Sequence, residues 1–175
     1  MRRLLLLRHA KAERSQPGGR DLERVLTDRG RADARKLGAY VVRHGLAPDL
    51  AMVSTAARTR ETWHLLSAAF DRPPQARFDE RLYNAAPGAI LRAIKETAPK
   101  IATLLLIGHN PGLHEAAVML VAAGDVEARQ RLGEHFPTAA LAVIEFAPAD
   151  WSRLHVQGGR LEHFVAPRSL TAAAD

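Results

Sequence analysis

Four consecutive leucines near the start of the chain, Leu4 to Leu7, are followed directly by Arg8 and His9. A short apolar run of this kind, placed before a loop and a helical pattern, is typical of the first parallel strand of an α/β sheet, in which both faces are covered. Ligands of open α/β sheets bind outside the carboxyl ends of the strands. The sequence therefore predicts that Arg8 and His9 lie at a ligand site.

Strand and helix patterns alternate through the first two thirds of the chain, which predicts an α/β protein with a mostly parallel sheet and right-handed crossovers. Thr27, the pair Ser54-Thr55, and Asn110 with Pro111 at the first helical position are the expected N-terminal caps of three helices. The expected helices are Thr27 to Gly45, Ser54 to Pro73, Pro87 to Ala98 and Asn110 to about Ala123, and the expected strands between them are Leu50 to Val53, Ala76 to Phe78 and Thr103 to Ile107.

Beyond the fourth expected helix, the sequence pattern predicts strands alone. Three are expected, Ala139 to Phe146, Arg153 to Gln157 and Arg160 to Val165, the last two joined by a hairpin turn at Gly158-Gly159. With 175 residues, of which 47% are hydrophobic and 25% charged, we expect one domain covering residues 1–175. Thr171 to Asp175 is expected to be a short disordered tail.

The chain has no cysteine, which excludes disulfides, thiolate metal sites and cysteine nucleophiles. The apolar run at the N-terminus is shorter than the region of about 7–15 residues in a secretory signal, and no run has the length of a membrane span. We therefore expect a soluble cytoplasmic protein without a membrane partner. The net charge of +6 favours anionic partners. Because aromatic residues are few and not interleaved with basic runs, we expect no nucleic-acid partner.

Chemically distinctive residues follow three of the expected strands: Arg8 and His9, Arg58 one helical turn beyond Ser54, and His109. The carboxyl ends of parallel strands share one edge of the sheet, so these side chains can converge on one pocket. An arginine fork suits a phosphoryl group, and a neutral imidazole can attack phosphorus and leave again. The alternatives are that Arg58 pairs with Glu61 or faces solvent, and that His109 is a core histidine.

A carboxylic acid is needed to protonate a leaving group and then to activate water. Glu80 is the predicted acid, with Asp79 as second choice. The alternative is a surface carboxylate beside Arg77 and Arg81. The long connection Ala10 to Leu26 is basic, and its cations are either solvated or steer anions. Substrate contacts are predicted for Lys11, Arg24 and Asn110.

Metal binding is not expected, because His109 and His114 do not have the spacing of a zinc helix motif. The remaining histidines are interpreted as structural or surface residues: His44, His64, His114, His135, His155 and His163.

Four separated motifs resemble the histidine phosphatase superfamily, most closely its SixA-type phosphohistidine phosphatases. The motifs are Leu7 to Ala12, Arg24 to Thr27 followed by Gly30, Ser54 through Arg58 to Thr62, and Gly108 to Pro111. The resemblance extends from Arg2 to about Ala122. It implies a phosphoglycerate mutase-like, three-layer α/β/α fold whose mostly parallel sheet has an antiparallel edge strand.

The same resemblance implies that His9 is the phosphorylated nucleophile, that Arg8, Arg58 and His109 form the phosphate pocket, and that no metal or cofactor takes part. Ala10 stands where the family motif usually has glycine, which favours the SixA-like branch over the mutases. By contrast, Asp79 to Tyr83 resembles the acid-bearing loop of the mutases and broader phosphatases.

The favoured hypothesis is a metal-independent phosphatase that forms a phosphohistidine on His9 and acts on phosphohistidine in a protein. Two alternatives stay open: a phosphomonoesterase of small molecules, and a non-catalytic module that binds a phosphorylated ligand. The expected partner is accordingly a phosphorylated protein or a small phosphate ester, and phosphate or sulfate is expected to occupy the pocket.

Overall fold

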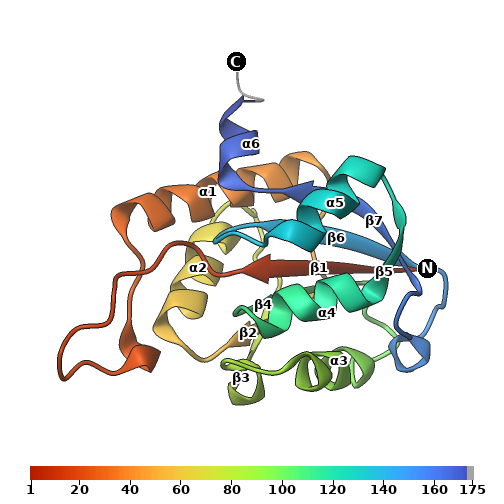
Figure 1. Ribbon diagram of the computed structural model, residues 1–175, viewed down its shortest axis with the longest axis horizontal. Helices are drawn as coiled ribbons and strands as arrows, with labels where there is room; N and C mark the ends of the chain where they lie inside the picture. The colour runs from red at the N-terminus through yellow and green to blue at the C-terminus, as the bar shows by residue number, and fades with distance from the viewer. Residues whose placement is uncertain (173–175) are drawn as a thin grey trace.

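The run of four leucines lies at the centre of the sheet. The computed structural model describes the backbone of residues 1–172 and the side chains of residues 1–170, and in it Leu4 to Leu7 are fully buried. Seven strands form one sheet in the order β3-β2-β4-β1-β6-β7-β5 (Figure 1). The strands are β1 (Arg2–Arg8), β2 (Leu50–Ser54), β3 (Gln75–Asp79), β4 (Thr103–Gly108), β5 (Val121–Gly124), β6 (Leu141–Phe146) and β7 (Gly159–Val165).

The sheet is mostly parallel, as predicted. Strands β3, β2, β4 and β1 run parallel, whereas β6 is antiparallel to both β1 and β7, and β5 is parallel to β7. The antiparallel strand therefore lies inside the sheet and not at its edge. The register of β1 and β4 pairs Arg8 with Gly108, which aligns the ends of the two strands.

Helices cover both faces of the sheet and complete the three layers (Figure 1). On one face α1 packs against α2 and α6, and on the other α3 and α5 pack against α4. In the described part of the chain, no helix is long and apolar enough to cross a membrane. The helices are α1 (Asp28–Arg43), α2 (Ala57–Ser67), α3 (Pro87–Lys95), α4 (Gly112–Leu120), α5 (Val126–Glu134) and α6 (Pro167–Ala172), with 3-10 turns η1 (Asp21–Glu23), η2 (Glu80–Leu82) and η3 (Trp151–Arg153).

The four leucines contribute to the hydrophobic cores on both faces of the sheet, because successive side chains of a strand point to opposite faces. Leu5 and Leu7 belong to the core under α1 and α2, and Leu4 and Leu6 to the core under α3 and α4. Burial on both faces explains why β1 is a continuous apolar run instead of an alternating one.

Two of the predicted helix starts are as expected. The Thr27 hydroxyl accepts a hydrogen bond from the Gly30 amide at the start of α1, and Pro87 lies in the first turn of α3. The predicted cap at Ser54 is wrong: α2 begins at Ala57, and its N-cap residue, Ala56, makes no side-chain hydrogen bond. The Ser54 hydroxyl is instead bonded to a buried histidine.

The start of α4 also differs from the prediction. The helix begins at Gly112, after a cis peptide bond between Asn110 and Pro111. The side-chain amide of Asn110 donates to the Phe136 carbonyl at 2.9 Å and does not cap the helix. A tertiary contact has therefore replaced the local cap.

The C-terminal third departs furthest from the prediction. Arg153 to Gln157 is not a strand: Arg153 ends the 3-10 turn η3, and residues 154–157 form a loop. The turn is held by Trp151, which is fully buried and donates from its ring nitrogen to the Ile101 carbonyl. Strand β7 consequently pairs with β6 and not across a hairpin at Gly158-Gly159. The sequence prediction also missed β5, α5 and α6. Of the predicted tail, residues 171–172 end α6 and residues 173–175 lie outside the described chain.

Candidate active site

The carboxyl ends of β1, β2 and β4 bring three side chains that are distant in sequence to one cavity of about 400 Å³: His9, Arg58 and His109. Arg8, Lys11, Arg24 and Asn110, all predicted site residues, line the same cavity, whereas Glu80 does not. Its other lining residues are Ala12, Asp21, Asn84 and Thr138.

The ring of His9 is held in one tautomer. His9 is 8% exposed, and its Nδ1 lies 2.7 Å from the Ala10 carbonyl oxygen. A carbonyl can only accept a hydrogen bond, so Nδ1 carries the proton and the lone pair of the neutral ring is on Nε2. The rings of His9 and His109 lie 5.3 Å apart between centroids. His9 thus has a free nucleophilic nitrogen beside a second imidazole.

Burial keeps this ring neutral. The pKa of His9 is lowered from 6.5 to about 4 because burial disfavours the cation, and although the hydrogen bond to Ala10 opposes the shift, the nearby guanidinium groups, chiefly that of Arg58, add to it. The imidazole is therefore uncharged, and able to attack, throughout the neutral pH range.

His109 is oriented by Ser54. The Ser54 hydroxyl lies 2.7 Å from His109 Nε2, and the Tyr83 ring meets the imidazole edge to face with centroids 5.5 Å apart. Burial, followed by the charge of Arg58, lowers the pKa of His109 to about 3. Within the described residues its Nδ1 is buried and has no hydrogen-bond partner. When the serine hydroxyl donates to Nε2, the proton stays on Nδ1, which is then a donor available to a ligand.

Arg58 is tied to Asp21, a residue absent from the sequence-predicted site. The Arg58 guanidinium, 2% exposed, donates to the Asp21 main-chain oxygen at 2.9 Å and to its carboxylate at 3.2 Å. The pairing with Glu61 does not form, because Glu61 binds the Leu26 amide and the Arg31 side chain. The alternative of a merely solvated Arg58 is likewise excluded.

The Asp21 carboxylate is surrounded by donors. Tyr83 donates its hydroxyl to one oxygen, and Arg24 donates to the other at 2.9 Å. These bonds, that of Tyr83 first, lower the pKa of Asp21 to about 2, although partial burial opposes the shift. Asp21 is therefore ionised at neutral pH. It lies in the long connection, where the sequence pattern drew attention only to cations.

Arg8 and Asn110 converge on one carbonyl. Both donate to the Phe136 oxygen, Arg8 at 3.1 Å and Asn110 at 2.9 Å. The Ala139 amide in turn donates to the main-chain oxygens of Arg8 and His9. These bonds lock the segment before β6 against the end of β1.

Two close approaches fix the connections around the cavity. A Cβ on Gly30 would lie 2.1 Å from the Lys11 carbonyl oxygen, and one on Gly112 would lie 1.8 Å from that of Ala85. Only glycine lets the chain pass at these points. The first holds the segment after His9 against the start of α1.

The predicted acids are not at the cavity. Glu80 is exposed in η2, and the Asp79 carboxylate is bonded to Arg81, with Arg77 at 3.9 Å. The hypothesis that Glu80 acts as the acid therefore has no support from the geometry. Among the described lining residues the carboxylate is that of Asp21. No group of three or more metal-ligating side chains is found in the described part of the chain.

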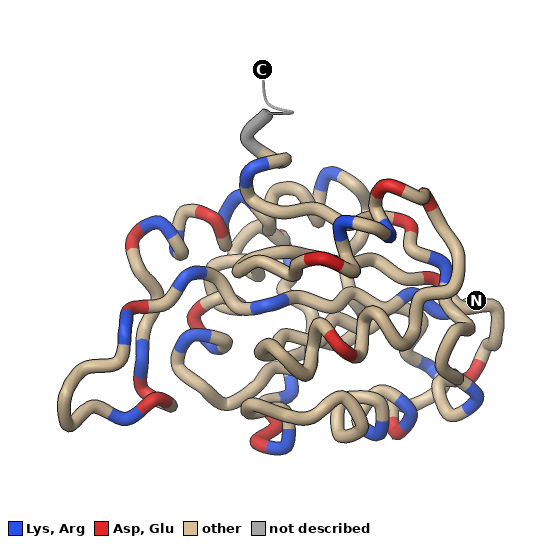
Figure 2. The backbone as a smooth tube through the Cα atoms, viewed as in Figure 1, with Lys and Arg blue, Asp and Glu red and all other residues tan. Residues whose placement is uncertain are grey.

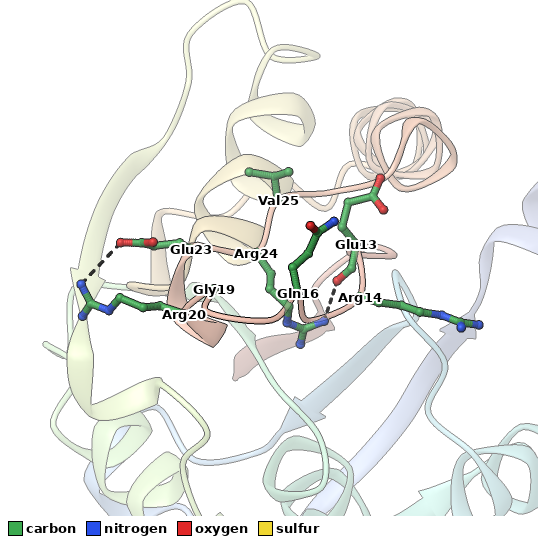
Figure 3. A pocket seen from close by; sticks show the side chains of 8 residues that line it. All are labelled: Glu13, Arg14, Gln16, Gly19, Arg20, Glu23, Arg24 and Val25. Atoms are coloured by element: carbon green, nitrogen blue, oxygen red, sulfur yellow. Dashed lines mark hydrogen bonds and ion pairs between the residues drawn. The ribbon is translucent and has the colours of Figure 1, made fainter.

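The connection between β1 and α1 projects beyond the cavity and contains a hollow of about 310 Å³ lined by its own residues (Figure 3). Arg24 reaches from the hollow to the Glu13 carbonyl at 2.8 Å, and Arg20 pairs with Glu23 at the surface. Lys and Arg are frequent along this connection (Figure 2). They supply positive charge next to the cavity.

A cavity lined by guanidinium groups and neutral buried imidazoles, at the carboxyl edge of a mostly parallel sheet, is the kind of site that binds a phosphoryl group. The comparison with known sequences specifies the family. The sequence profile of the histidine phosphatase superfamily (branch 1) matches residues 4–106, and the chain belongs to this superfamily.

Relatives match along nearly the whole chain. An uncharacterized protein of Mycobacterium tuberculosis is 34% identical over 165 residues, which cover 93% of this chain and 100% of the relative. Among solved structures, the candidate phosphohistidine phosphatase SixA of Agrobacterium tumefaciens has a TM-score of 0.81 and 31% identity, covering 95% of this chain and 98% of that protein. The corresponding SixA protein of Nakamurella multipartita has a TM-score of 0.83 and 29% identity, covering 95% and 96%.

Proposed function

We propose that the protein is a phosphohistidine phosphatase that removes the phosphoryl group from a histidine of another protein by way of a phosphohistidine on its own His9. The observation that carries this proposal is the fixed neutral tautomer of His9, whose Nε2 is free in a cavity lined by Arg8, Arg58 and His109. SixA-type relatives of similar fold and about 30% identity support the substrate class.

In the first step Nε2 of His9 attacks phosphorus, and the bond between phosphorus and the substrate nitrogen breaks. In this proposal Arg58, Arg8 and the Nδ1 proton of His109 donate to the three phosphoryl oxygens, where charge is spread in the transition state. To do so, Arg58 must exchange its carboxylate partner, Asp21, for the phosphoryl group.

The leaving group is the reason to favour phosphohistidine over an alkyl ester. A phosphorylated imidazole that carries a proton on its other nitrogen leaves as a neutral ring, so no acid is required from the protein. An alkoxide needs a proton donor, which contributes typically 10²- to 10⁴-fold to such a step. The carboxylate at this cavity, Asp21, is ionised and already bonded to Arg24 and Tyr83.

The second step mirrors the first. Water attacks phosphorus, and His9 leaves as a neutral ring because its Nδ1 keeps the proton that it donates to Ala10. The proton lost by the water passes to the phosphate product and to solvent. The completed cycle therefore returns His9 to the neutral imidazole from which it began.

Access to the cavity also suits a protein substrate. The connections from β2 to α2 and from β4 to α4 are short, at 55–56 and 109–111, so the long segment 10–26 is the main projection beside the site (Figure 1). A side chain on the surface of another protein can reach His9 without passing under a lid.

The test is a substrate panel assayed with wild type and with His9→Ala. We expect kcat/KM for phosphoimidazole and for histidine-phosphorylated protein to exceed that for glycerol phosphate by about 100-fold or more, with para-nitrophenyl phosphate between them, and His9→Ala to be inactive on all. Equal rates on the alkyl ester would instead support the small-molecule phosphomonoesterase, and binding without turnover would support the non-catalytic module.

A further inference from the structure

A second, basic cavity adjoins the first. It measures about 220 Å³ and is lined by three cations, Lys11, Arg29 and Arg168, together with Thr138 and Asp33. Lys11 and Thr138 also line the cavity of His9, so the two hollows share a wall. Nothing in the proposed chemistry at His9 uses Arg29 or Arg168.

Three separate elements deliver these cations. Lys11 is held against the start of α1, because its carbonyl accepts from the Thr27 amide at 2.9 Å and passes close to Gly30. Arg29 lies in the first turn of that helix, and Arg168 lies in α6, which packs against α1. Their convergence is therefore a property of the tertiary fold and not of a basic run in the sequence.

The position of the second cavity relative to the nucleophile is fixed by the main chain. Lys11 follows His9 by two residues, and Thr138 precedes Ala139, whose amide donates to the main-chain oxygens of Arg8 and His9 at 3.1 and 3.0 Å. The wall between the cavities is thus bonded directly to the end of β1. A ligand group in the second cavity would have a defined distance from the phosphoryl group at His9.

The described residues neutralise the charge of this cavity only in part. Within the described chain, none of the three cations forms an ion pair, although eight other arginines do. Asp33 is the lining carboxylate, so three positive charges face one negative charge. Cations gathered around one hollow without partners repel one another, and an anion bound between them would relieve that repulsion.

We propose that this second cavity binds a further anionic group, a phosphate or a carboxylate, of the same molecule whose phosphoryl group is transferred to His9. The proposal rests on the proposed function and narrows its substrate class to molecules with two anionic groups. The second group comes either from a small bisphosphate or from an acidic side chain near the phosphohistidine of a protein.

The first experiment measures inhibition of para-nitrophenyl phosphate hydrolysis by alkanediol bisphosphates of increasing length and by the matching monophosphates. We expect bisphosphates within one range of lengths to bind roughly 5- to 20-fold more tightly than the matching monophosphates, since each exposed ion pair contributes modestly. This advantage in affinity should shrink as the salt concentration is raised. In Arg29→Gln/Arg168→Gln the advantage should disappear while kcat/KM for para-nitrophenyl phosphate stays within about twofold of wild type.

The matched control is Arg35→Gln/Arg153→Gln, which removes the same charge from two exposed arginines that line neither cavity. It should keep the advantage of the bisphosphate. Loss of the bisphosphate's advantage in both double variants would show that the advantage comes from net charge alone, and would overturn the proposal. Equal binding of bisphosphates and monophosphates to wild type would overturn it as well.

A second arm separates the two sources of the anion. Histidine-phosphorylated peptides with aspartate or alanine at positions near the phosphohistidine are compared by kcat/KM. A preference for aspartate that vanishes in Arg29→Gln/Arg168→Gln assigns the cavity to a protein carboxylate, and a response to bisphosphates alone assigns it to a second phosphate. If neither responds while His9→Ala remains inactive, this inference fails and the proposed function stands; turnover by His9→Ala would refute the proposed function itself.

Discussion

Arg58 and Asp21 are joined twice: one guanidinium nitrogen donates to the Asp21 main-chain oxygen at 2.9 Å and the other to its carboxylate at 3.2 Å. The arginine is almost fully buried, whereas the aspartate side chain is 40% exposed. The carboxylate therefore neutralises a buried arginine of the cavity. In the proposed chemistry an incoming phosphoryl group replaces this carboxylate.

Replacing Asp21 with asparagine should tighten the binding of inorganic phosphate. The substitution removes a negative charge from the anion cavity and frees one donor of Arg58, so we expect the Kd for phosphate to fall about 3- to 10-fold. The free energy of unfolding should fall by about 1 kcal/mol, because the partly exposed ion pair is lost. Calorimetric titration and chemical denaturation measure the two effects.

Glu23→Gln is the control for that substitution. It makes the same charge change in the same 3-10 turn, where Glu23 pairs with Arg20 at the surface. Its phosphate affinity should stay close to that of wild type. An Asp21→Asn protein that binds phosphate no better than wild type would show that the carboxylate does not compete for Arg58.

Ser54 should matter for activity although it is fully buried. Ser54→Ala leaves His109 Nε2 without its partner at 2.7 Å, so the imidazole loses its fixed tautomer. We expect kcat/KM to fall about 10-fold and stability by about 1–3 kcal/mol. Ser67→Ala, which removes a hydroxyl bonded only to its own helix, should leave kcat/KM unchanged. Equal activity in the two variants would contradict a role for Ser54 in orienting His109.

Stability should decrease on the acid side of neutrality. The pKa values of His9 and His109, about 4 and about 3 in the folded protein, lie below the 6.5 of the unfolded chain, which therefore binds protons more readily. The contribution of the two neutral rings to the free energy of unfolding is complete above pH 6.5. It falls as the pH drops toward the folded-state pKa values, by up to about 1.4 kcal/mol per pH unit for each histidine.

Denaturation curves at a series of pH values check this linkage. Below pH 6.5 the decline should be shallower in His9→Asn/His109→Asn, which lacks both groups. Because the pKa of Asp21 is lowered from 3.8 to about 2, its contribution to stability is lost only below about pH 4, so the slopes are compared between pH 6.5 and about pH 4. A wild-type free energy of unfolding that is constant across this range would refute the neutral state assigned to the two rings.

The close approach at Gly30 predicts a glycine that tolerates no side chain. Gly30→Ala would place a Cβ 2.1 Å from the Lys11 carbonyl oxygen, so we expect a loss of about 2 kcal/mol or more together with reduced activity, since Lys11 follows the nucleophile closely. Gly133→Ala is the counterpart, because the space around this helical glycine is open. It should stabilise the protein by about 0.5–1 kcal/mol. Similar thermal stability of the two variants would contradict the packing described for Lys11.

The part of the site that follows from the sequence is the part located at strand ends. Leu4 to Leu7 define a buried strand without any knowledge of the fold, and a parallel sheet then requires His9 and His109 to share an edge. Asp21 does not follow in this way, because it comes from a long connection whose path is set by tertiary bonds to Arg58 and Tyr83.

The difference between local pattern and tertiary contact also explains where the predicted fold was wrong. Ser54 and Asn110 have the side chains of helix caps, but each is bonded to a distant residue instead, His109 and the Phe136 carbonyl. Arg153 to Gln157 alternates like a strand, yet it forms the end of a 3-10 turn and a loop, because the chain before it is held by the buried Trp151 indole and its bond to the Ile101 carbonyl. Local preference decides only where no stronger tertiary contact competes with it.

The central claim is that His9 carries the phosphoryl group during turnover. Wild type mixed rapidly with labelled phosphoimidazole and quenched in alkali should yield a phosphohistidine, and peptide mapping should place it on His9, in an amount that rises and decays at rates consistent with kcat. His9→Asn should yield none and turn over no substrate. Label on another residue, or product formed at the wild-type rate by His9→Asn, would contradict the account.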